Sequence, residues 1–405
     1  MGTLSGVGVS HQRNAVKAAQ EAVKKAFLAA GTEEPDFVLL FASLGYNPEK
    51  LLSAVRQATK NCSLVGCSGQ GVIAQGEADE SSFSVAVMVI KSDELHFKNH
   101  LIHHQESNVE HNVEGNVERL SFEQVGEALG RKIQADMPIN PIALFLFTDG
   151  LTLNFDRLAA GLQSTLQTQQ FLPILGGAAG SNIDMKLTYQ FCDDRVLTDG
   201  TVVALMSGTA HIAWASNHGC IPIGTEYKIT RAAGTMIYEL NHKPVFEVLR
   251  QYFSEDEIAR WDRTMVSFCF GFKPQENDDF AIRYISRKDE IAGSVMLQTE
   301  VIEGTSVWVM RRDQELIYQG TEELAQSIKA QLNGRSPIAI FQFDCYGRGK
   351  SVLTEHQKFQ NLHQLQNDIG TSLPWIGFYS HGEIAPVGQR NTFHNYTLVL
   401  VAIYS

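Results

Sequence analysis

One order of sequence patterns occurs three times along this chain: an apolar strand, a helix, a glycine-rich loop and a further apolar strand. The three glycine-rich segments are residues 66–74, 173–180 and 377–386. Glycine at the end of a strand lets a backbone approach a ligand or another backbone closely. We therefore predict a mixed α/β fold that is built from repeated units, with the glycine loops converging on a pocket.

Continuous apolar runs are typical of strands that are covered on both faces of a sheet. Such runs occupy residues 36–43, 83–90, 141–147, 201–206, 337–343 and 396–404. Apolar residues at helical spacing predict the helices that alternate with these strands. The helices are expected over residues 11–30, over a segment that opens at Asn47-Pro48, and over residues 155–167 and 357–369.

Two regions differ from the repeated units. Residues 265–310 contain short alternating runs, which predict antiparallel strands. Residues 103–118 contain three Asn-Val-Glu triplets at a four-residue period, which would place the three valines on one face of a helix. Because Gly115 and the β-branched residues oppose a helix there, we expect a solvated helical or disordered insertion.

Length, charge and cysteine usage narrow the class of protein. At 405 residues the chain is expected to form two domains. The formal net charge of −12 argues against nonspecific nucleic-acid binding and against anchoring to an anionic membrane. No apolar run approaches the ~20 residues that span a bilayer, and residues 1–10 lack a secretory pattern, so a cytoplasmic location is expected. No CxxC pair occurs, so free thiols are expected at Cys62, Cys67, Cys192, Cys220, Cys269 and Cys345.

Several short motifs occur in an order and at a spacing that together resemble one known family, although each motif alone is weak. They are Gly66-Cys67-Ser68 with Gly71 and Ile73, residues 172–180 with Asn182, residues 219–224, residues 239–244, Cys345 with Gly347 and Arg348, residues 377–379, residues 382–384, and His394-Asn395 with Thr397. These motifs resemble the FIST family of sensory proteins, and the match covers most of the chain.

The resemblance implies a FIST N-type sensory domain over residues 1–215 and a FIST C-type sensory domain over residues 216–405, with mixed sheets flanked by helices. It also implies ligand sensing in bacterial signal transduction. Members that resemble this chain in size are understood to bind haem, to sense nitric oxide and to control a partner histidine kinase. Because the sequence contains no receiver or kinase motif, we expect the chain to act on its partner in trans.

Two other functions remain open from the sequence. One is a haem-free sensor of a small metabolite such as an amino acid, and the other is an enzyme that acts on a small molecule. Gly66-Cys67-Ser68-Gly69 does not have the spacing of a nucleophile elbow, and no coherent set of nucleophile, base and acid is visible. We therefore expect a binding protein rather than an enzyme.

The motif residues nominate a ligand-binding site. Glu383 could accept from a ligand ammonium or pair with Arg348 or Arg390, and Arg348 could bind a carboxylate such as a haem propionate. The alternative for each is a charge that orders its loop. Val72 takes the place where the family commonly has a glutamate, so Glu383 is the sole Gly-Glu-Ile glutamate here. The complete candidate set is Cys67, Ser68, Gly69, Gly177, Arg348, Glu383, His394 and Asn395.

Two histidines are the candidate ligands of a haem iron. His381 precedes Gly382 and His218 precedes Gly219, so each imidazole adjoins flexible backbone. His381 is the first choice and His218 the second, with an ordinary loop histidine as the alternative for both. Cys220 could supply a thiolate, but its apolar surroundings make it a weaker candidate.

Overall fold

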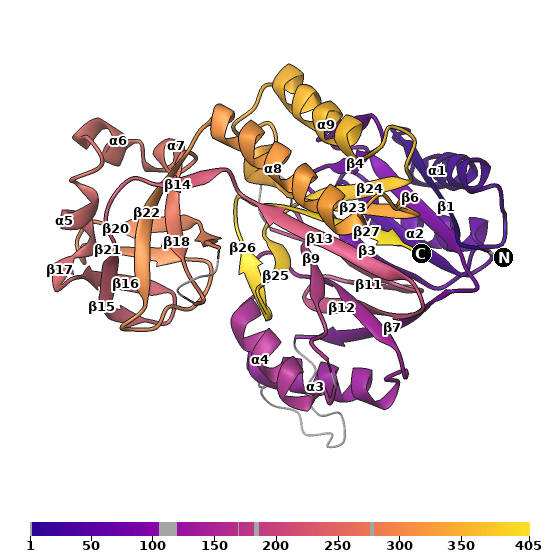
Figure 1. The fold of residues 1–405 in the computed structure, drawn as a ribbon, viewed down its shortest axis with the longest axis horizontal. Helices are drawn as coiled ribbons and strands as arrows, with labels where there is room; N and C mark the ends of the chain where they lie inside the picture. The colour runs from indigo at the N-terminus through magenta and orange to yellow at the C-terminus, as the bar shows by residue number, and fades with distance from the viewer. Residues whose placement is uncertain (1, 105–119, 169, 182–185, 276–278) are drawn as a thin grey trace.

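The computed structural model describes residues 2–104, 120–168, 170–181, 186–275 and 279–405. The predicted mixed α/β fold is confirmed: three six-stranded mixed sheets form the main body of the molecule. Residues 220–312 form a separate small lobe at one end (Figure 1). The insertion expected at residues 103–118 lies outside the described residues from residue 105 onward.

Each sheet of the main body contains one four-stranded unit with the same strand order. In each unit the first strand of this order pairs antiparallel with the second, and the second pairs antiparallel with the third. The third strand pairs parallel with the fourth. The first unit is β1 (Leu4–Ser10), β6 (Val85–Lys91), β2 (Phe37–Ala42) and β3 (Leu64–Ser68). The second is β7 (Leu95–His103), β12 (Gly200–Gly208), β8 (Pro141–Thr148) and β9 (Ile174–Ala178). The third is β13 (His211–Asn217), β27 (Leu398–Tyr404), β23 (Ala339–Cys345) and β24 (Trp375–Ser380).

A hairpin from a different unit completes each sheet. The hairpin of β4 (Val72–Ala74) and β5 (Glu77–Asp79) joins β24 of the third unit. The hairpin of β10 (Gln190–Cys192) and β11 (Arg195–Leu197) joins β3. The hairpin of β25 (Glu383–Val387) and β26 (Arg390–His394) joins β9. Two of the three sheets therefore combine strands from both sides of residue 215, and the division at that residue stays a prediction.

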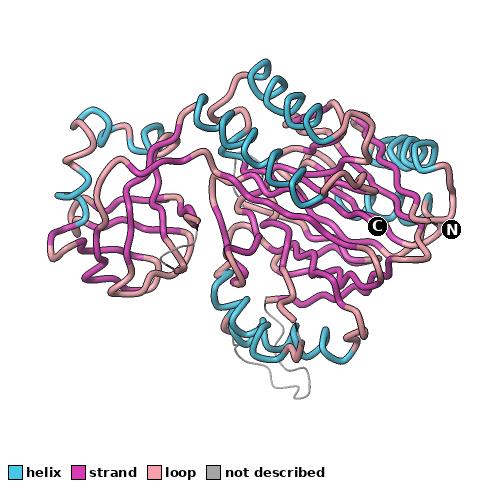
Figure 2. Tube along the Cα trace, in the orientation of Figure 1, coloured by secondary structure: helices cyan, strands magenta, loops and turns pink. Residues whose placement is uncertain are grey.

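A pair of helices covers the outer face of each unit. The pairs are α1 (Ala15–Ala30) with α2 (Pro48–Ala58), α3 (Phe122–Ala135) with α4 (Phe155–Thr165), and α8 (Gln314–Leu332) with α9 (Glu355–Ile369). Figure 2 shows these helices outside the strands. The predicted start at Asn47-Pro48 is confirmed, because Asn47 Oδ1 accepts from the Lys50 N–H at 2.8 Å and Pro48 is the first helical residue. No helix in the described part of the chain is long and apolar enough to cross a membrane.

Three equivalent phenylalanines form the centre of the main body. Phe41, Phe147 and Phe343 occupy the same position in β2, β8 and β23, one residue after the partner of a glycine in the parallel neighbour. Their ring centroids lie 5.3, 5.8 and 6.5 Å apart, with edge-on geometry in every pair. The threefold repeat predicted from the sequence is therefore a spatial repeat around a shared aromatic core.

The segments predicted as glycine loops are largely strands, which is a correction. Gly66, Gly176 and Gly377 lie inside β3, β9 and β24, at equivalent positions. A Cβ at any of them would come within 1.8 to 2.0 Å of the carbonyl oxygen of the parallel neighbour. These glycines thus permit close strand packing, and only the short turns that follow them are loops.

The small lobe is an antiparallel nine-stranded sheet with three short helices, and it confirms the antiparallel strands predicted for residues 265–310. Its strands are β14 (Cys220–Pro222), β15 (Tyr227–Ala233), β16 (Met236–Leu240), β17 (Lys243–Pro244), β18 (Phe268–Phe272), β19 (Ala281–Arg283), β20 (Ile285–Asp289), β21 (Ser294–Leu297) and β22 (Ser306–Arg312). Its helices are α5 (Val245–Leu249), α6 (Glu255–Ala259) and α7 (Trp261–Thr264). The lobe is inserted between β13 and α8 of the third unit.

Candidate functional site

The turns that follow β3, β9 and β24 meet and bind one another. Ser68 Oγ donates to the Gly180 carbonyl at 2.7 Å, and the Gly180 N–H donates to the Ser68 carbonyl at 2.8 Å. The Gln70 N–H donates to the Tyr379 carbonyl at 2.9 Å. A Cβ at Gly180 would lie 2.3 Å from the Gln70 nitrogen, so only glycine allows this approach. The predicted convergence of the three turns is confirmed, and their junction is filled by backbone.

A polar hollow of about 320 Å³ lies beside this junction, at the carboxyl ends of β2 and β3. We call it the loop pocket. It is lined by Ser43, Leu44, Gly45, Gly69, Gln70, Glu80, Ser81, Ser82, Ser181 and Lys350. Lys350 follows β23, a strand of the third unit, so residues from all three units border one hollow.

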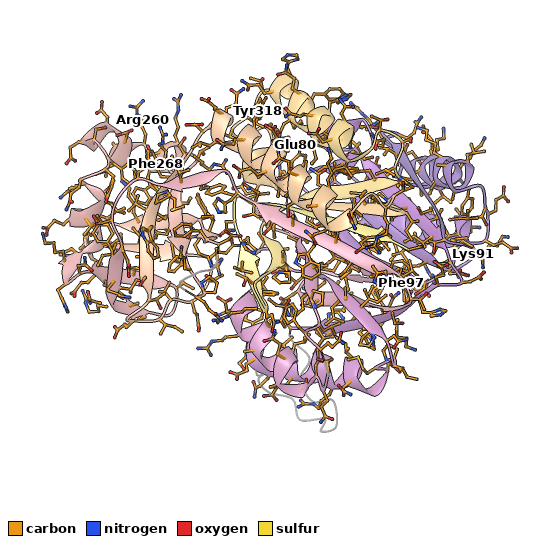
Figure 3. All side chains as sticks on the ribbon, viewed as in Figure 1. Glu80, Lys91, Phe97, Arg260, Phe268 and Tyr318 are labelled. Carbon is orange, nitrogen blue, oxygen red and sulfur yellow. The ribbon has the colours of Figure 1, made fainter. Side chains whose placement is uncertain are left out.

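A buried ion pair forms one wall of the loop pocket. Glu80 is labelled in Figure 3. Its Oε2 accepts from Lys358 Nζ at 2.9 Å and from the Lys350 N–H at 2.8 Å. Burial alone would lower the pKa of Lys358, but its attraction to Glu80 outweighs burial and raises that pKa. The other carboxylate oxygen, Glu80 Oε1, has no hydrogen-bond partner among the described residues.

Ser181 supplies a second unsatisfied group at the same hollow. The residue is fully buried, and its Oγ has no partner among the described residues. Its backbone N–H donates to His381 Nε2 at 3.2 Å. Buried polar atoms without partners are uncommon in folded proteins and call for a ligand or an ordered water. The two residues that carry these atoms, Glu80 and Ser181, both line the loop pocket, and the atoms themselves are closed to solvent.

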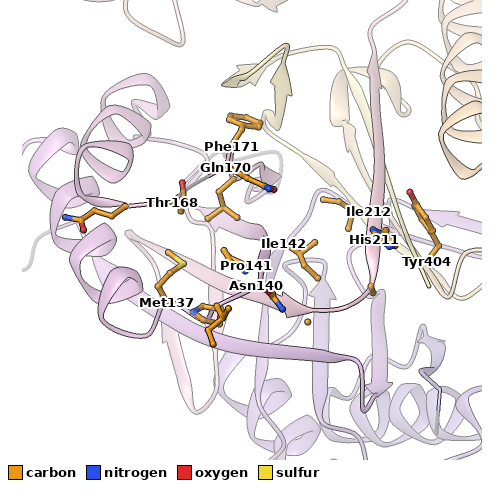
Figure 4. A pocket seen from close by; sticks show the side chains of 16 residues that line it. Met137, Asn140, Pro141, Ile142, Thr168, Gln170, Phe171, His211, Ile212 and Tyr404 are labelled. Carbon is orange, nitrogen blue, oxygen red and sulfur yellow. The ribbon is translucent and has the colours of Figure 1, made fainter.

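A larger hollow of about 730 Å³ opens on the opposite side of the second sheet, where β8 begins and α4 ends (Figure 4). Residues such as Met137, Phe171, Ile212 and Tyr404 form its walls. His211 is the sole ionisable side chain of its described lining besides Tyr404, and none of the buried unsatisfied polar atoms belongs to it. The larger volume would favour this hollow as the ligand site, but the two buried polar atoms without partners favour the loop pocket.

Arg348 is held by a carboxylate that the motif analysis did not nominate. The guanidinium is buried, and its Nε donates to Asp344 Oδ1 at 2.9 Å while Nη2 donates to Thr321 Oγ1 at 3.0 Å. The pairing of Glu383 with Arg348 or Arg390, considered from the sequence, is therefore wrong. Asp344 lies in β23 and Arg348 in the short turn that follows, so the helical rule for residues four positions apart does not apply and no sequence signal marks this pair.

Glu383 is fully buried in the β25–β26 hairpin without a cation. Its carboxyl group accepts from Ser380 Oγ at 2.6 Å and from the Thr397 N–H at 3.1 Å. Burial raises the pKa of Glu383 well above its usual range, because no cation offsets the cost of burying its charge. The carboxyl group anchors the turn here through its hydrogen bonds instead of forming an ion pair.

His394 and Asn395 also make internal contacts. His394 pairs with Glu383 across the hairpin, and its Nε2–H donates to the Ala385 carbonyl at 3.1 Å. Burial lowers the pKa of His394 to about 3, so the imidazole is neutral. Asn395 Oδ1 accepts from the Tyr284 N–H at 2.9 Å, which ties the small lobe to the main body.

The remaining candidates divide between the core and the loop pocket. Cys67 is fully buried in the central core, and burial raises the pKa of its thiol. Gly177 pairs with Glu383, so the structure gathers these two residues and His394 at one hairpin. Of the eight candidate binding residues, only Gly69 lines the loop pocket.

Neither candidate histidine is arranged as an iron ligand. His381 Nε2 accepts the Ser181 N–H, and His218 Nδ1 accepts the Cys220 N–H at 2.9 Å. In a neutral imidazole the proton then sits on the other nitrogen, so neither nitrogen keeps a free lone pair for iron. An iron-binding histidine instead binds the metal with one nitrogen and donates the N–H of the other nitrogen to the protein. Burial also lowers the pKa of His381 to about 4. The residues in this arrangement do not fit a haem at either histidine, and the haem itself stays a prediction.

One buried network has the connectivity of a hydrolase triad. Asp199 Oδ1 lies 2.9 Å from His104 Nδ1, and His104 Nε2 lies 2.9 Å from Thr201 Oγ1. However, Thr201 is fully buried, and its hydroxyl also lies 2.8 Å from Thr148 Oγ1. A substrate carbonyl has no approach to that hydroxyl, so the network crosslinks strands in the second unit.

The sequence analysis missed the residues that build the loop pocket, namely Glu80, Ser181, Lys350 and Lys358. Glu80 follows an acidic stretch with no motif, and the lysines lie in a polar segment of ordinary composition. Glu80 and Lys358 are 278 positions apart in the chain. Their pairing had no local signal.

Comparisons with known proteins agree over most of the chain. The FIST N domain matches residues 36–243, and the FIST C domain matches residues 246–386. An uncharacterised protein of Mycobacterium tuberculosis strain H37Rv is 26% identical over 408 residues, covering 97% of each chain. An uncharacterised protein of Methanocaldococcus jannaschii is 23% identical over 227 residues, covering 52% of this chain and 41% of that protein.

Two solved structures show only distant likeness. A chorismatase has a TM-score of 0.33 and 7% identity, with 93% of this chain and 94% of that chain covered. A cyanuric acid hydrolase from A. caulinodans has a TM-score of 0.36 and 10% identity, with coverage of 100% and 99%. Both scores are too low to transfer an activity.

Proposed function

The chain belongs to the family that the FIST N and FIST C domains define, and these are sensor domains of signal transduction. On that premise we propose that the chain senses a small polar ligand in the loop pocket. The observation that carries the proposal is the pair of buried, unsatisfied polar atoms at one hollow, Glu80 Oε1 and Ser181 Oγ. A ligand with a donor for the carboxylate and an acceptor for the hydroxyl would satisfy both.

The charges of the lining favour a zwitterion of amino-acid size. Glu80 offers a carboxylate oxygen to a ligand ammonium, and the Lys350 ammonium, which donates to the Glu80 carbonyl at 3.1 Å, borders the same hollow. A volume of about 320 Å³ is at the small end of the range for ligand pockets. A free amino acid is therefore the ligand class that we propose, as the haem-free alternative of the sequence analysis.

The route to a partner starts at Glu80. This carboxylate joins the loop pocket to Lys358 in α9, and α9 packs against α8 on the outer face of the third unit (Figure 1). A ligand ammonium at Glu80 would compete with Lys358 for the carboxylate and so shift the balance of contacts beneath α9. We propose that a separate cytoplasmic signalling protein, such as a histidine kinase, binds the surface formed by α8 and α9 and responds to this shift.

Calorimetric titration with a panel of free amino acids tests the proposal. Ser181→Ala removes one unsatisfied hydroxyl from the pocket and should weaken binding about five- to tenfold, while stability stays close to that of the wild type. Ser294→Ala is the matched control, because Ser294 Oγ is also buried and without a partner among the described residues but lies in the small lobe. Equal binding by both variants, or no binding of any amino acid by the wild type, would contradict the proposal.

Haem with nitric oxide as its signal remains the competing ligand that the family resemblance implies. Its support is the resemblance of this chain to haem-binding members, whereas the amino-acid proposal rests on the chemistry of a described hollow. The enzyme alternative has weaker support, since the His104 network is sealed from substrate.

A further inference from the structure

Two cysteines meet where the small lobe joins the main body. Cys220 lies in β14 and Cys269 in β18, and both strands pair with β22. Their Sγ atoms are 3.7 Å apart, and the Cys269 thiol donates to the Cys220 sulfur. The two residues share one buried cluster, which also contains Cys345 and Tyr396.

A buried arginine without an anionic partner adjoins this pair. Arg312 is the direct cross-strand neighbour of Cys220 and is 1% exposed. Its guanidinium lies 3.9 Å from the ring centre of Tyr396, and Nη2 donates to the Gly347 carbonyl. Its Nε and Nη1 have no hydrogen-bond partner among the described residues. A buried cation is costly unless an anion compensates it, and the ionisable group directly opposite is the Cys220 thiol.

The six thiols therefore differ in character. Burial would raise the pKa of Cys220, but the hydrogen bond from Cys269 and the nearby His218 and Arg312 outweigh burial and lower it. Burial raises the pKa of Cys269, which keeps the proton that it donates. Cys62 is more exposed than either, yet burial raises its pKa to about 12. A lowered thiol pKa, rather than exposure, separates Cys220 from the other five cysteines.

We propose that Cys220 and Cys269 form a site of reversible oxidation by peroxides. The Cys220 thiolate attacks a peroxide oxygen, so that an S–O bond forms, the O–O bond breaks and hydroxide leaves. The Cys269 thiol then attacks the sulfenic sulfur, which forms the S–S bond and releases water with the thiol proton. For hydrogen peroxide the dithiol loses two electrons, and the peroxide is reduced to two molecules of water.

The position of the pair gives the oxidation a structural consequence. β14 belongs to the segment that leads from β13 of the main body into the small lobe (Figure 1). β14 and β18 pair with opposite sides of β22, so ordinary strand spacing puts them about 10 Å apart. A disulfide spans less than about 7 Å between Cα atoms, so a Cys220–Cys269 bond would have to draw β14 toward β18. Oxidation would thus lock the junction of the lobe, separately from ligand binding in the loop pocket.

Thiol chemistry on the full chain tests this site. We expect iodoacetamide to label Cys220 at pH 7 about tenfold faster than Cys62, and hydrogen peroxide to yield a Cys220–Cys269 disulfide in peptide mass spectra. Labelling of the urea-unfolded chain should remove the difference between Cys220 and Cys62. Faster labelling of Cys62 in the folded chain, or a peroxide-treated chain without this disulfide, would overturn the proposal.

Two variants separate the roles of the neighbours. Cys269→Ser removes the resolving thiol, so peroxide should leave a Cys220 sulfenic acid that dimedone traps. Arg312→Met removes the cation and should slow labelling of Cys220 about tenfold while Cys62 is unchanged. If Arg312→Met fails to fold, Cys269→Ser still decides, because absence of a trapped sulfenic acid at Cys220 would contradict the proposal.

Discussion

The β4–β5 and β25–β26 hairpins occupy equivalent places in the threefold repeat, yet they treat a carboxyl group in opposite ways. In the first, Val72 lies at the buried position and the acidic residue, Glu80, follows the hairpin. In the second, Glu383 itself takes the buried position. Glu80 is paired with Lys358 beside a hollow, whereas Glu383 is sealed without a cation. The comparison shows that equivalent hairpins can place one acid in an ion pair and bury the other without a cation, so that burial raises the pKa of Glu383 with nothing to offset it.

Removal of the cation from the first hairpin should have the largest effect. Lys358→Met leaves Glu80 buried without its ion-pair partner, and we expect the free energy of unfolding to fall by about 3–5 kcal/mol. Urea denaturation measures it. Lys25→Met, which breaks the exposed pair with Glu21 in α1, should cost about 0.5 kcal/mol or less. If the two variants lose equal stability, the buried pair of Glu80 and Lys358 contributes no more than the exposed pair does.

Acid should destabilise the protein through His381, whose Nε2 accepts the Ser181 N–H beside the loop pocket. Its pKa of about 4 lies below the unfolded value of 6.5, so its contribution to stability is complete above pH 6.5 and is lost as the pH falls to about 4. The loss should be roughly 3 kcal/mol. His381→Gln keeps an acceptor for Ser181 and should lose that much less stability in urea titrations between pH 6.5 and 4. The exposed His96→Gln is the control, and identical pH profiles for both variants would refute the buried neutral imidazole.

The second hairpin should tolerate the loss of its acid far better than the first tolerates the loss of its cation. Burial raises the pKa of Glu383, so Glu383→Gln, which removes the ionisable group and keeps its volume, should cost only about 1 kcal/mol at pH 7. The folded-state pKa is raised, so the wild type loses stability as the pH rises above the unfolded value of 4.5, and the variant should not. A variant that unfolds as readily as Lys358→Met would show that Glu383 is ionised.

The smallest expected effect is on the absorption spectrum. If the loop pocket binds a small polar ligand, as we propose, protein purified from haem-sufficient cells should show no Soret band. A Soret band would contradict the proposed ligand. The spectra of His381→Ala, His218→Ala and the double variant would then decide whether either histidine binds the iron, since loss of an axial bond shifts the band.

The sequence by itself determined the repeated architecture. Apolar runs and helical spacing are properties of neighbouring residues, so the order of strand, helix and strand was readable in all three units. The helix start at Asn47-Pro48 was readable for the same reason, because capping is satisfied within one turn. The motifs that mark the family are also local, and they identified the sensory class without a ligand.

Only the tertiary structure decided which residues form a site. Exchange of the hairpins brings Glu80 to Lys358 and Ser68 to Gly180, and such pairs, 278 and 112 positions apart, leave no pattern in the chain. The sequence shows where Gly66 and Gly377 lie. It does not show that they serve strand packing rather than ligand binding, because that depends on a carbonyl oxygen in another strand. Tertiary contacts then set the chemistry: the carboxyl group of Glu80 forms an ion pair with Lys358, whereas that of Glu383 is buried without a cation and its pKa is raised.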